Sequence, residues 1–176
     1  MLVAMGVFGW LAWTSHAEPG VGRVAGSRLA SVAASSLPDE QYELLARFLP
    51  PHYTPLPKAP KAFQSAMALY NAEDYAAAAS ALRVVSDAHP EFAAAKFYLG
   101  ISLLIAGNRI SGIQELRALT EAGDSSYVEP ARFYLAKALI GEHDLQRAQE
   151  QLRSVIEKHG GLQKQAAALL AQIEPS

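Results

Sequence analysis

Apolar and small residues recur at helical intervals from about residue 60 onwards, and the same pattern is written more than once. Residues 95–116, AKFYLGISLLIAGNRISGIQEL, are followed 36 residues later by residues 131–152, ARFYLAKALIGEHDLQRAQEQL. A third copy, residues 61–82, stands 34 residues upstream of the first. Each copy is interrupted near its middle by a polar pair, and each therefore predicts two short amphipathic helices joined by a tight turn. The three turns are expected at Glu73-Asp74, Gly107-Asn108 and His143-Asp144.

Small residues stand at matching positions in all three copies. They are Ala66, Gly100 and Ala136 in the first helices and Ala78, Gly112 and Ala148 in the second helices. Glycine inside a helix costs about 1 kcal/mol relative to alanine, so Gly112 requires a compensating reason. We expect these positions to let the two helices of each copy approach closely, because a bulky side chain there would overpack the interface.

A helix-turn-helix period of 34 residues, with a large aliphatic and then a small residue in the first helix, resembles the tetratricopeptide repeat family. The resemblance runs from about Ala59 to Gly160, and Pro90 stands where that family ends a second helix. It implies an all-α fold: a right-handed α-α solenoid of three helix pairs at about 59–92, 93–128 and 129–160. A capping helix at 162–173 completes the domain 59–176. The chain departs from the pattern at Gly160, where the family has proline, and in the loop EAGDSSYVEP, which holds two extra residues.

The stretch before the copies is expected to be a linker, residues 18–58, that contains one short helix. Residues 18–36 are rich in Gly, Ala and Ser, which predicts a flexible segment. Ser36 and Asp39 have capping-box spacing, so a helix near 38–48 is expected. Pro50 and Pro51 should end that helix. The following residues, PPHYTPLPKAP, predict an extended, proline-stiffened connector.

The first thirteen residues, MLVAMGVFGWLAW, are uncharged and shorter than the roughly 20 residues that span a bilayer. Trp10 and Trp13 are typical of an aromatic belt where a helix leaves a membrane. We expect residues 1–17 to be the end of a membrane anchor whose apolar helix starts upstream. The alternatives are a signal peptide cleaved after the Ser15–Ala17 stretch and a buried apolar helix.

A narrower resemblance concerns FYLGISLL, GDSSYVEPARFYLAKAL and ARFLPPHYTPL, which are similar to segments of bacterial membrane-anchored tetratricopeptide proteins. It implies a bacterial inner-membrane protein with a periplasmic repeat domain, or a secreted or periplasmic protein if a signal is cleaved. Many proteins of that group carry an N-terminal anti-sigma zinc-finger domain, which this sequence does not contain. The resemblance therefore leaves a second interpretation open, the sensor half of an anti-sigma-type regulator.

Composition excludes several classes of function. The net charge is −2 and the Lys and Arg residues are scattered, whereas nucleic-acid binding normally needs a basic patch. The chain has no cysteine, which rules out disulfides and cysteine-based zinc sites. We expect no cofactor and no metal.

The five histidines do not form a catalytic or metal-binding set. His89 and His159 are expected at helix C-termini, and His143 is expected in a solvated turn. His16 and His52 are isolated along the sequence. No nucleophile elbow and no phosphate-binding glycine loop is present. The sequence therefore predicts a protein that is not an enzyme and has no small-molecule substrate.

What remains is a binding surface on the first helices, which line a concave groove in the implied fold. The candidate groove residues are Phe63, Met67, Tyr70, Phe97, Ile101, Leu104, Ile105, Phe133, Lys137 and Ile140. Two interpretations are open: an exposed groove for a protein or peptide partner, or core that the helix at 38–48 covers. We expect residues 38–57 to cover Phe63 and to leave Phe97 and Phe133 for an outside partner. The predicted function is a non-catalytic, membrane-tethered protein-interaction scaffold.

Overall fold

The computed structural model describes residues 37–123 and 125–174, which all belong to one compact unit, Leu37–Ser176. These residues form eight α-helices and no strand, which confirms the all-α class. The helices are α1 (Asp39–Ala46), α2 (Lys61–Asn71), α3 (Tyr75–Ala88), α4 (Ala93–Ile105), α5 (Arg109–Glu121), α6 (Val128–Gly141), α7 (Leu145–Glu157) and α8 (Gln163–Ile173).

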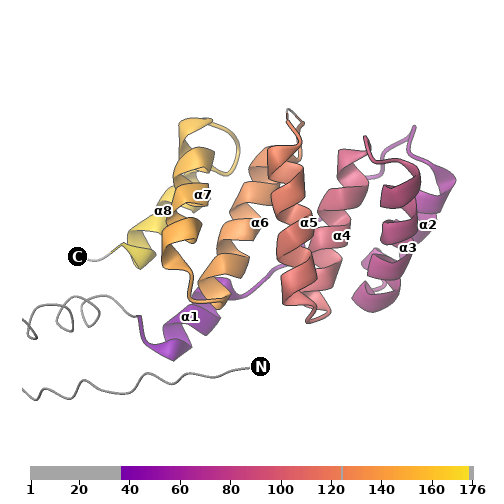
Figure 1. Cartoon of the computed structure of the whole chain (residues 1–176). Helices are drawn as coiled ribbons and strands as arrows, with labels where there is room; N and C mark the ends of the chain where they lie inside the picture. The colour runs from indigo at the N-terminus through magenta and orange to yellow at the C-terminus, as the bar shows by residue number, and fades with distance from the viewer. Residues whose placement is uncertain (1–36, 124, 175–176) are drawn as a thin grey trace, which may run out of the picture. The chain divides into compact units, whose positions relative to one another are not determined.

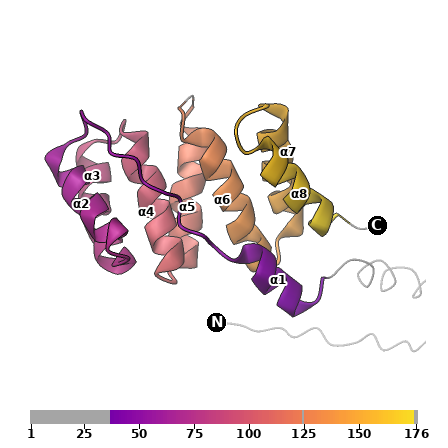
Figure 2. The ribbon, with the colours of Figure 1, turned by 180° about the vertical axis from the view of Figure 1, so that it is seen from behind.

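Helices α2 to α8 stand side by side in chain order, and each packs on the next (Figure 1). Helix α1 is the exception, since it packs on α6, far away in the sequence. The chain between α1 and α2 then crosses the row of helices, as Figure 2 shows. Residues 37–58, which were predicted to be the end of a linker, therefore belong to the packed unit.

The three polar turns share one backbone geometry. Their central residues, Glu73, Gly107 and His143, have positive φ angles of 62°, 87° and 60°. The amide of the next residue donates to a carbonyl five positions earlier in each case. The three bonds are Asp74 N to Leu69 O at 3.0 Å, Asn108 N to Leu103 O at 2.8 Å and Asp144 N to Leu139 O at 2.9 Å. This is the left-handed helix ending that glycine adopts most readily, and only the middle turn has glycine there.

The close approach predicted for the small residues is present between α4 and α5. A Cβ atom on Gly100 would lie 2.8 Å from Leu116 Cγ, and one on Gly112 would lie 2.9 Å from the Gly100 carbonyl oxygen. The four alanines at the equivalent positions of the other helices are all buried. The glycines are therefore explained by packing, which outweighs their cost in helix propensity.

Gly160 lies beside a carboxylate that comes from α6. The carboxylate of Glu129, at the start of α6, accepts a hydrogen bond from the Leu162 amide at 2.7 Å. A Cβ atom on Gly160 would lie 2.0 Å from the other Glu129 oxygen. The loop between α7 and α8 thus closes around this carboxylate.

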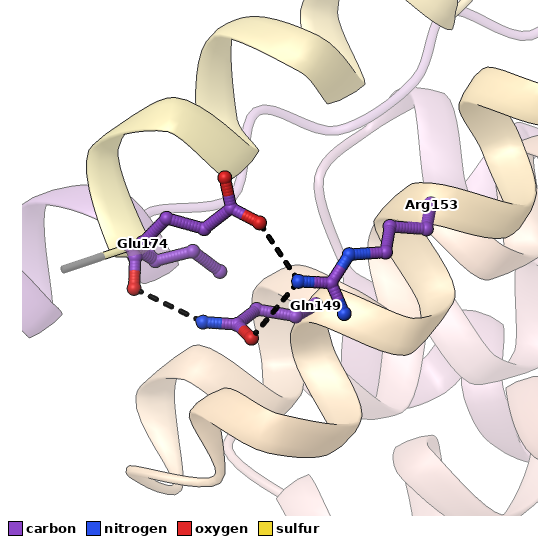
Figure 3. A network of polar contacts seen from close by, with 4 residues as sticks. Gln149, Arg153 and Glu174 are labelled. Carbon is purple, nitrogen blue, oxygen red and sulfur yellow. Dashed lines mark hydrogen bonds and ion pairs between the residues drawn. The ribbon is translucent and has the colours of Figure 1, made fainter. Parts of the chain in front are cut away.

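Helix α8 is joined to α7 by polar contacts near its C-terminus (Figure 3). Arg153 Nη2 donates to Glu174 Oε1 at 2.7 Å and to Gln149 Oε1 at 3.5 Å. Gln149 Nε2 donates to the Ile173 carbonyl oxygen at 3.2 Å. Beneath these contacts, buried side chains of α8 (Ala166, Leu169 and Ile173) face the core. The helix expected at 162–173 therefore closes one end of the row.

The short helix expected near 38–48 is present as α1, but it ends at Ala46 and thus before the prolines. Its N-cap is Pro38, without a side-chain hydrogen bond. The cap predicted at Ser36 lies outside the described residues, as do the apolar segment 1–17 and the flexible stretch 18–36. In the part of the chain that the structure describes, no helix is both long and apolar enough to span a membrane.

Candidate functional site

The ten predicted groove residues lie on α2, α4 and α6, but few of their side chains are accessible. Seven are at most 5% exposed and Ile105, Phe133 and Lys137 are half-buried; the seven are Phe63, Met67, Tyr70, Phe97, Ile101, Leu104 and Ile140. The expectation that Phe97 is open to an outside partner is therefore wrong. Its ring is covered by the rings of Tyr98, Tyr127 and Tyr134, at centroid distances of 5.2–6.0 Å.

Leu104 is another predicted groove residue that an outside partner could not reach, because it belongs to the contact between α4 and α5. A Cβ atom on Gly112 would lie 2.6 Å from Leu104 Cγ. Helix α5 therefore covers Leu104.

The occupant of the predicted groove is the chain itself. We call residues 47–57, RFLPPHYTPLP, the strap, and the side of α2, α4 and α6 that it contacts the strap face. Figure 2 shows the strap leaving α1 beside α6, crossing α4 and reaching α2. The strap has no regular secondary structure before the turn at its end. Its backbone polar groups are therefore available to the helices that it crosses.

A row of tyrosines, one from each of the three helices, donates hydrogen bonds to strap carbonyls. The Tyr134 hydroxyl donates to Leu49 O at 3.0 Å, and the Tyr70 hydroxyl donates to Pro51 O at 3.0 Å. The Tyr98 hydroxyl donates to His52 O at 3.4 Å. We call Tyr70, Tyr98 and Tyr134 the tyrosine row.

The tyrosine row stays protonated at physiological pH. Burial raises the pKa of all three hydroxyls above the ordinary value of 10.0, and neighbouring tyrosines add to the effect at Tyr70 and Tyr98. A neutral phenol is a hydrogen-bond donor, so each hydroxyl can donate to a carbonyl at physiological pH.

Lys137, a predicted groove residue, also contacts the strap. Its ammonium donates to the carbonyl of Arg47 and lies 5.8 Å from the centre of the Phe48 ring, within the range of a cation–π contact. Burial lowers the pKa of Lys137. Lys137 is thus a fourth donor to the strap, at the end nearest α1.

Two aromatic side chains of the strap add apolar contact. The Phe48 ring stacks on Tyr134 with centroids 6.2 Å apart. Tyr53, which is 8% exposed, meets Phe63 at 5.9 Å and Tyr98 at 5.6 Å, both edge to face. This is the coverage of Phe63 that the sequence analysis expected, and Tyr53 provides it.

Other strap side chains point to solvent. Leu49 is 72% exposed, and Pro50, His52 and Thr54 are also exposed. The strap is therefore held by its backbone carbonyls, by two rings five positions apart and by half-buried Leu56, which packs against the core.

Helix α1 fixes the N-terminal end of the strap. Tyr42, 5% exposed, stacks on the ring of His143 with centroids 3.9 Å apart. Ala46 lies against Gly141, where an added Cβ atom would come within 3.1 Å. His143 itself is exposed, as expected for a turn, but its stacking on Tyr42 was not predicted from the sequence.

Tyr98 and Tyr134 were not among the predicted groove residues, although both belong to the repeated pattern. They follow Phe97 and Phe133 directly, and their spacing of 36 residues was visible. Repetition of a polar-tipped aromatic in successive first helices was the available signal. It could not identify the partner of the hydroxyls, because that partner is an irregular segment.

In the part of the chain that the structure describes, no cluster of three or more metal-ligating side chains is present. No family model matches the chain, and no curated protein matches it significantly.

Proposed function

We propose that residues 37–174 form a peptide-binding module of the tetratricopeptide type, a right-handed α-α solenoid of three helix pairs with a capping helix. The sequence period and the common geometry of the turns at Glu73, Gly107 and His143 support this assignment. The module binds polypeptide on the strap face and performs no chemistry.

The observation that carries the proposal is the strap on this face. The tyrosine row and Lys137 present four donors along α2, α4 and α6, and all four are used by carbonyls of one extended segment. Every polypeptide has such carbonyls, and an extended one leaves them unpaired. A surface that satisfies them is suited to an extended peptide.

The test uses the full chain with Phe48→Ala and Tyr53→Ala, which removes both aromatic contacts of the strap. A fluorescent peptide of residues 46–57, ARFLPPHYTPLP, is titrated against it. Binding in the micromolar range is expected, and converting the tyrosine row to phenylalanine in the same chain should weaken it at least about tenfold, since each lost hydrogen bond is worth about 1 kcal/mol.

Tyr75→Phe is the matched control, because its ring lies 5.3 Å from that of Tyr70 and its hydroxyl has no hydrogen-bond partner among the described residues. This variant should bind the peptide as before. Absence of peptide binding by a folded chain would refute the proposed function.

We further propose that residues 1–13 tether the module to a bacterial inner membrane, with the module on the periplasmic side. The uncharged apolar run and its two tryptophans support this. The protein should remain with membranes after a carbonate wash. Full release into the soluble fraction at the full mass would exclude the tether.

A further inference from the structure

The strap resembles a bound ligand more than a core element. Helices α2, α4 and α6 donate to carbonyls of Arg47, Leu49, Pro51 and His52. The described hydrogen bonds from strap amides run from Arg47 to the Leu44 carbonyl of α1 and from Leu56 to the Tyr53 hydroxyl, each at 3.3 Å, and neither reaches α2, α4 or α6. The strap face therefore recognises the carbonyl acceptors of the strap backbone and not its amides.

Proline matches that requirement. The strap has prolines at 50, 51, 55 and 57, and none of them has an amide hydrogen that would be left unpaired against the helices. Proline also pre-orders the extended conformation, which lowers the entropy lost on binding. A segment of this composition can leave the face without breaking any regular secondary structure of its own.

The occupant is also tethered at both ends. Helix α1 fixes one end on α6, and α2 follows the other end closely. A short flexible tether gives an effective local concentration of about millimolar. An outside peptide of equal intrinsic affinity would therefore compete poorly while the strap is intact.

We infer that the strap is an intramolecular plug that must leave the strap face before an outside peptide can bind there. The partner carries the chemistry of the strap: an extended, proline-containing segment with two aromatic residues five positions apart. This inference rests on the proposed function and adds its regulation and the class of its partner.

The experiment compares three full-length chains with the same labelled peptide, ARFLPPHYTPLP. They are the wild type, the opened chain with Phe48→Ala and Tyr53→Ala, and a control with Leu49→Ala and Thr54→Ala. The control changes the same segment at side chains that face solvent. The opened chain should bind the peptide about tenfold to a hundredfold more tightly than the wild type, since the tethered competitor is removed. The control should bind like the wild type.

The outcomes separate the inference from the function beneath it. Equal, tight binding by wild type and opened chain would overturn the plug and leave the peptide-binding function standing. No binding by either chain, with helical circular dichroism retained, would overturn both. If the double variant does not fold, Tyr53→Ala alone is used, and a gain of at least about fivefold is expected because one anchoring ring remains.

A second copy of the chain is the competing occupant. Unlabelled wild-type protein is therefore added to the opened chain with bound peptide. It should displace the peptide much less well than free unlabelled peptide, because its strap stays on its own strap face. Displacement equal to that by free peptide, with a complex of twice the mass, would assign the site to strap exchange between copies and overturn the plug.

Discussion

Helix α4 meets α5 and the strap in two different ways. Against α5, Gly100 and Gly112 bring the two backbones so close that a Cβ atom on Gly112 would come within 2.9 Å of the Gly100 carbonyl oxygen. Against the strap, the tip of Tyr98 reaches a carbonyl at 3.4 Å and its ring meets Tyr53. The first contact depends on side-chain volume, and the second depends on donors that any extended backbone could use.

The difference separates what builds the module from what occupies it. Helices α4 and α5 fit together only because both have glycine at their contact, and a larger side chain at either position would overpack it. A row of hydroxyls facing carbonyls is far less particular about the sequence that supplies them.

The largest effect is expected at the contact between α4 and α5. Gly100→Leu should lower the free energy of unfolding by about 3 kcal/mol or more, because the new side chain meets buried Leu116 and forces the helices apart. Thermal and urea unfolding followed by circular dichroism measure the loss. Lys164→Ala, at an exposed site, should change stability by less than about 0.5 kcal/mol. A parent-like melting temperature for Gly100→Leu would contradict the packing account.

Alkaline pH should act on the strap side. The raised pKa values of the tyrosine row mean that, above pH about 10, the unfolded chain loses these protons before the folded chain does. The stabilisation is complete below that pH and is lost as pH rises, by up to about 1.4 kcal/mol per pH unit for each tyrosine. Lys137 has the opposite sign, since its lowered pKa adds stability as pH rises. It is one group against three.

Urea unfolding between pH 8 and 11.5 measures this slope. The chain with all three tyrosines of the row changed to phenylalanine is the comparison and should have a shallower slope. Equal slopes for the two chains would mean that the tyrosine row is not linked to stability.

A smaller effect is expected from one hydroxyl of the tyrosine row. Tyr70→Phe should cost about 1 kcal/mol, because the half-buried Pro51 carbonyl loses its donor while the ring packing is kept. Tyr75→Phe, the neighbouring ring, should cost much less. The difference between the two urea midpoints measures the contribution of the hydroxyl, and identical midpoints would argue against it.

The smallest effect is expected at a buried hydroxyl of α4. Ser102 in α4 is fully buried, and its hydroxyl has no hydrogen-bond partner among the described residues. The equivalent positions of the other two copies are Ala68 and Ala138. Ser102→Ala should raise stability by up to about 1 kcal/mol, since it removes an unpaired buried polar group. Chemical denaturation is sensitive enough to detect this, and a clear loss of stability would point to a partner for the hydroxyl.

Several features of the fold could be predicted from the sequence because they depend on local interactions. Helical periodicity placed the helices, and the polar pairs placed the three turns. The small residues at 100 and 112 predicted a close helix contact because few other reasons justify glycine inside a helix. Each of these inferences needed only residues that lie close together along the chain.

The candidate site could be predicted only in part. The sequence placed the ten residues on first helices, and it expected the 38–57 segment to cover Phe63. It could not assign Leu104 to the α5 side, since neighbouring apolar positions on one helix differ only by a rotation about its axis. It also left Phe97 open, although aromatic neighbours from α4 and α6 and the loop before α6 bury it.

The sequence by itself determined the helices, their turns and the small contact residues, because hydrogen bonds and periodicity within each helix decide them. Apart from its contact with Phe63, only the tertiary structure decided where the strap runs. An extended, proline-rich segment has no regular internal hydrogen bonds and no periodic apolar face, so its sequence does not identify the surface against which it packs. Its path became defined only when hydroxyls from α2, α4 and α6, distant in sequence, met its carbonyls along one face.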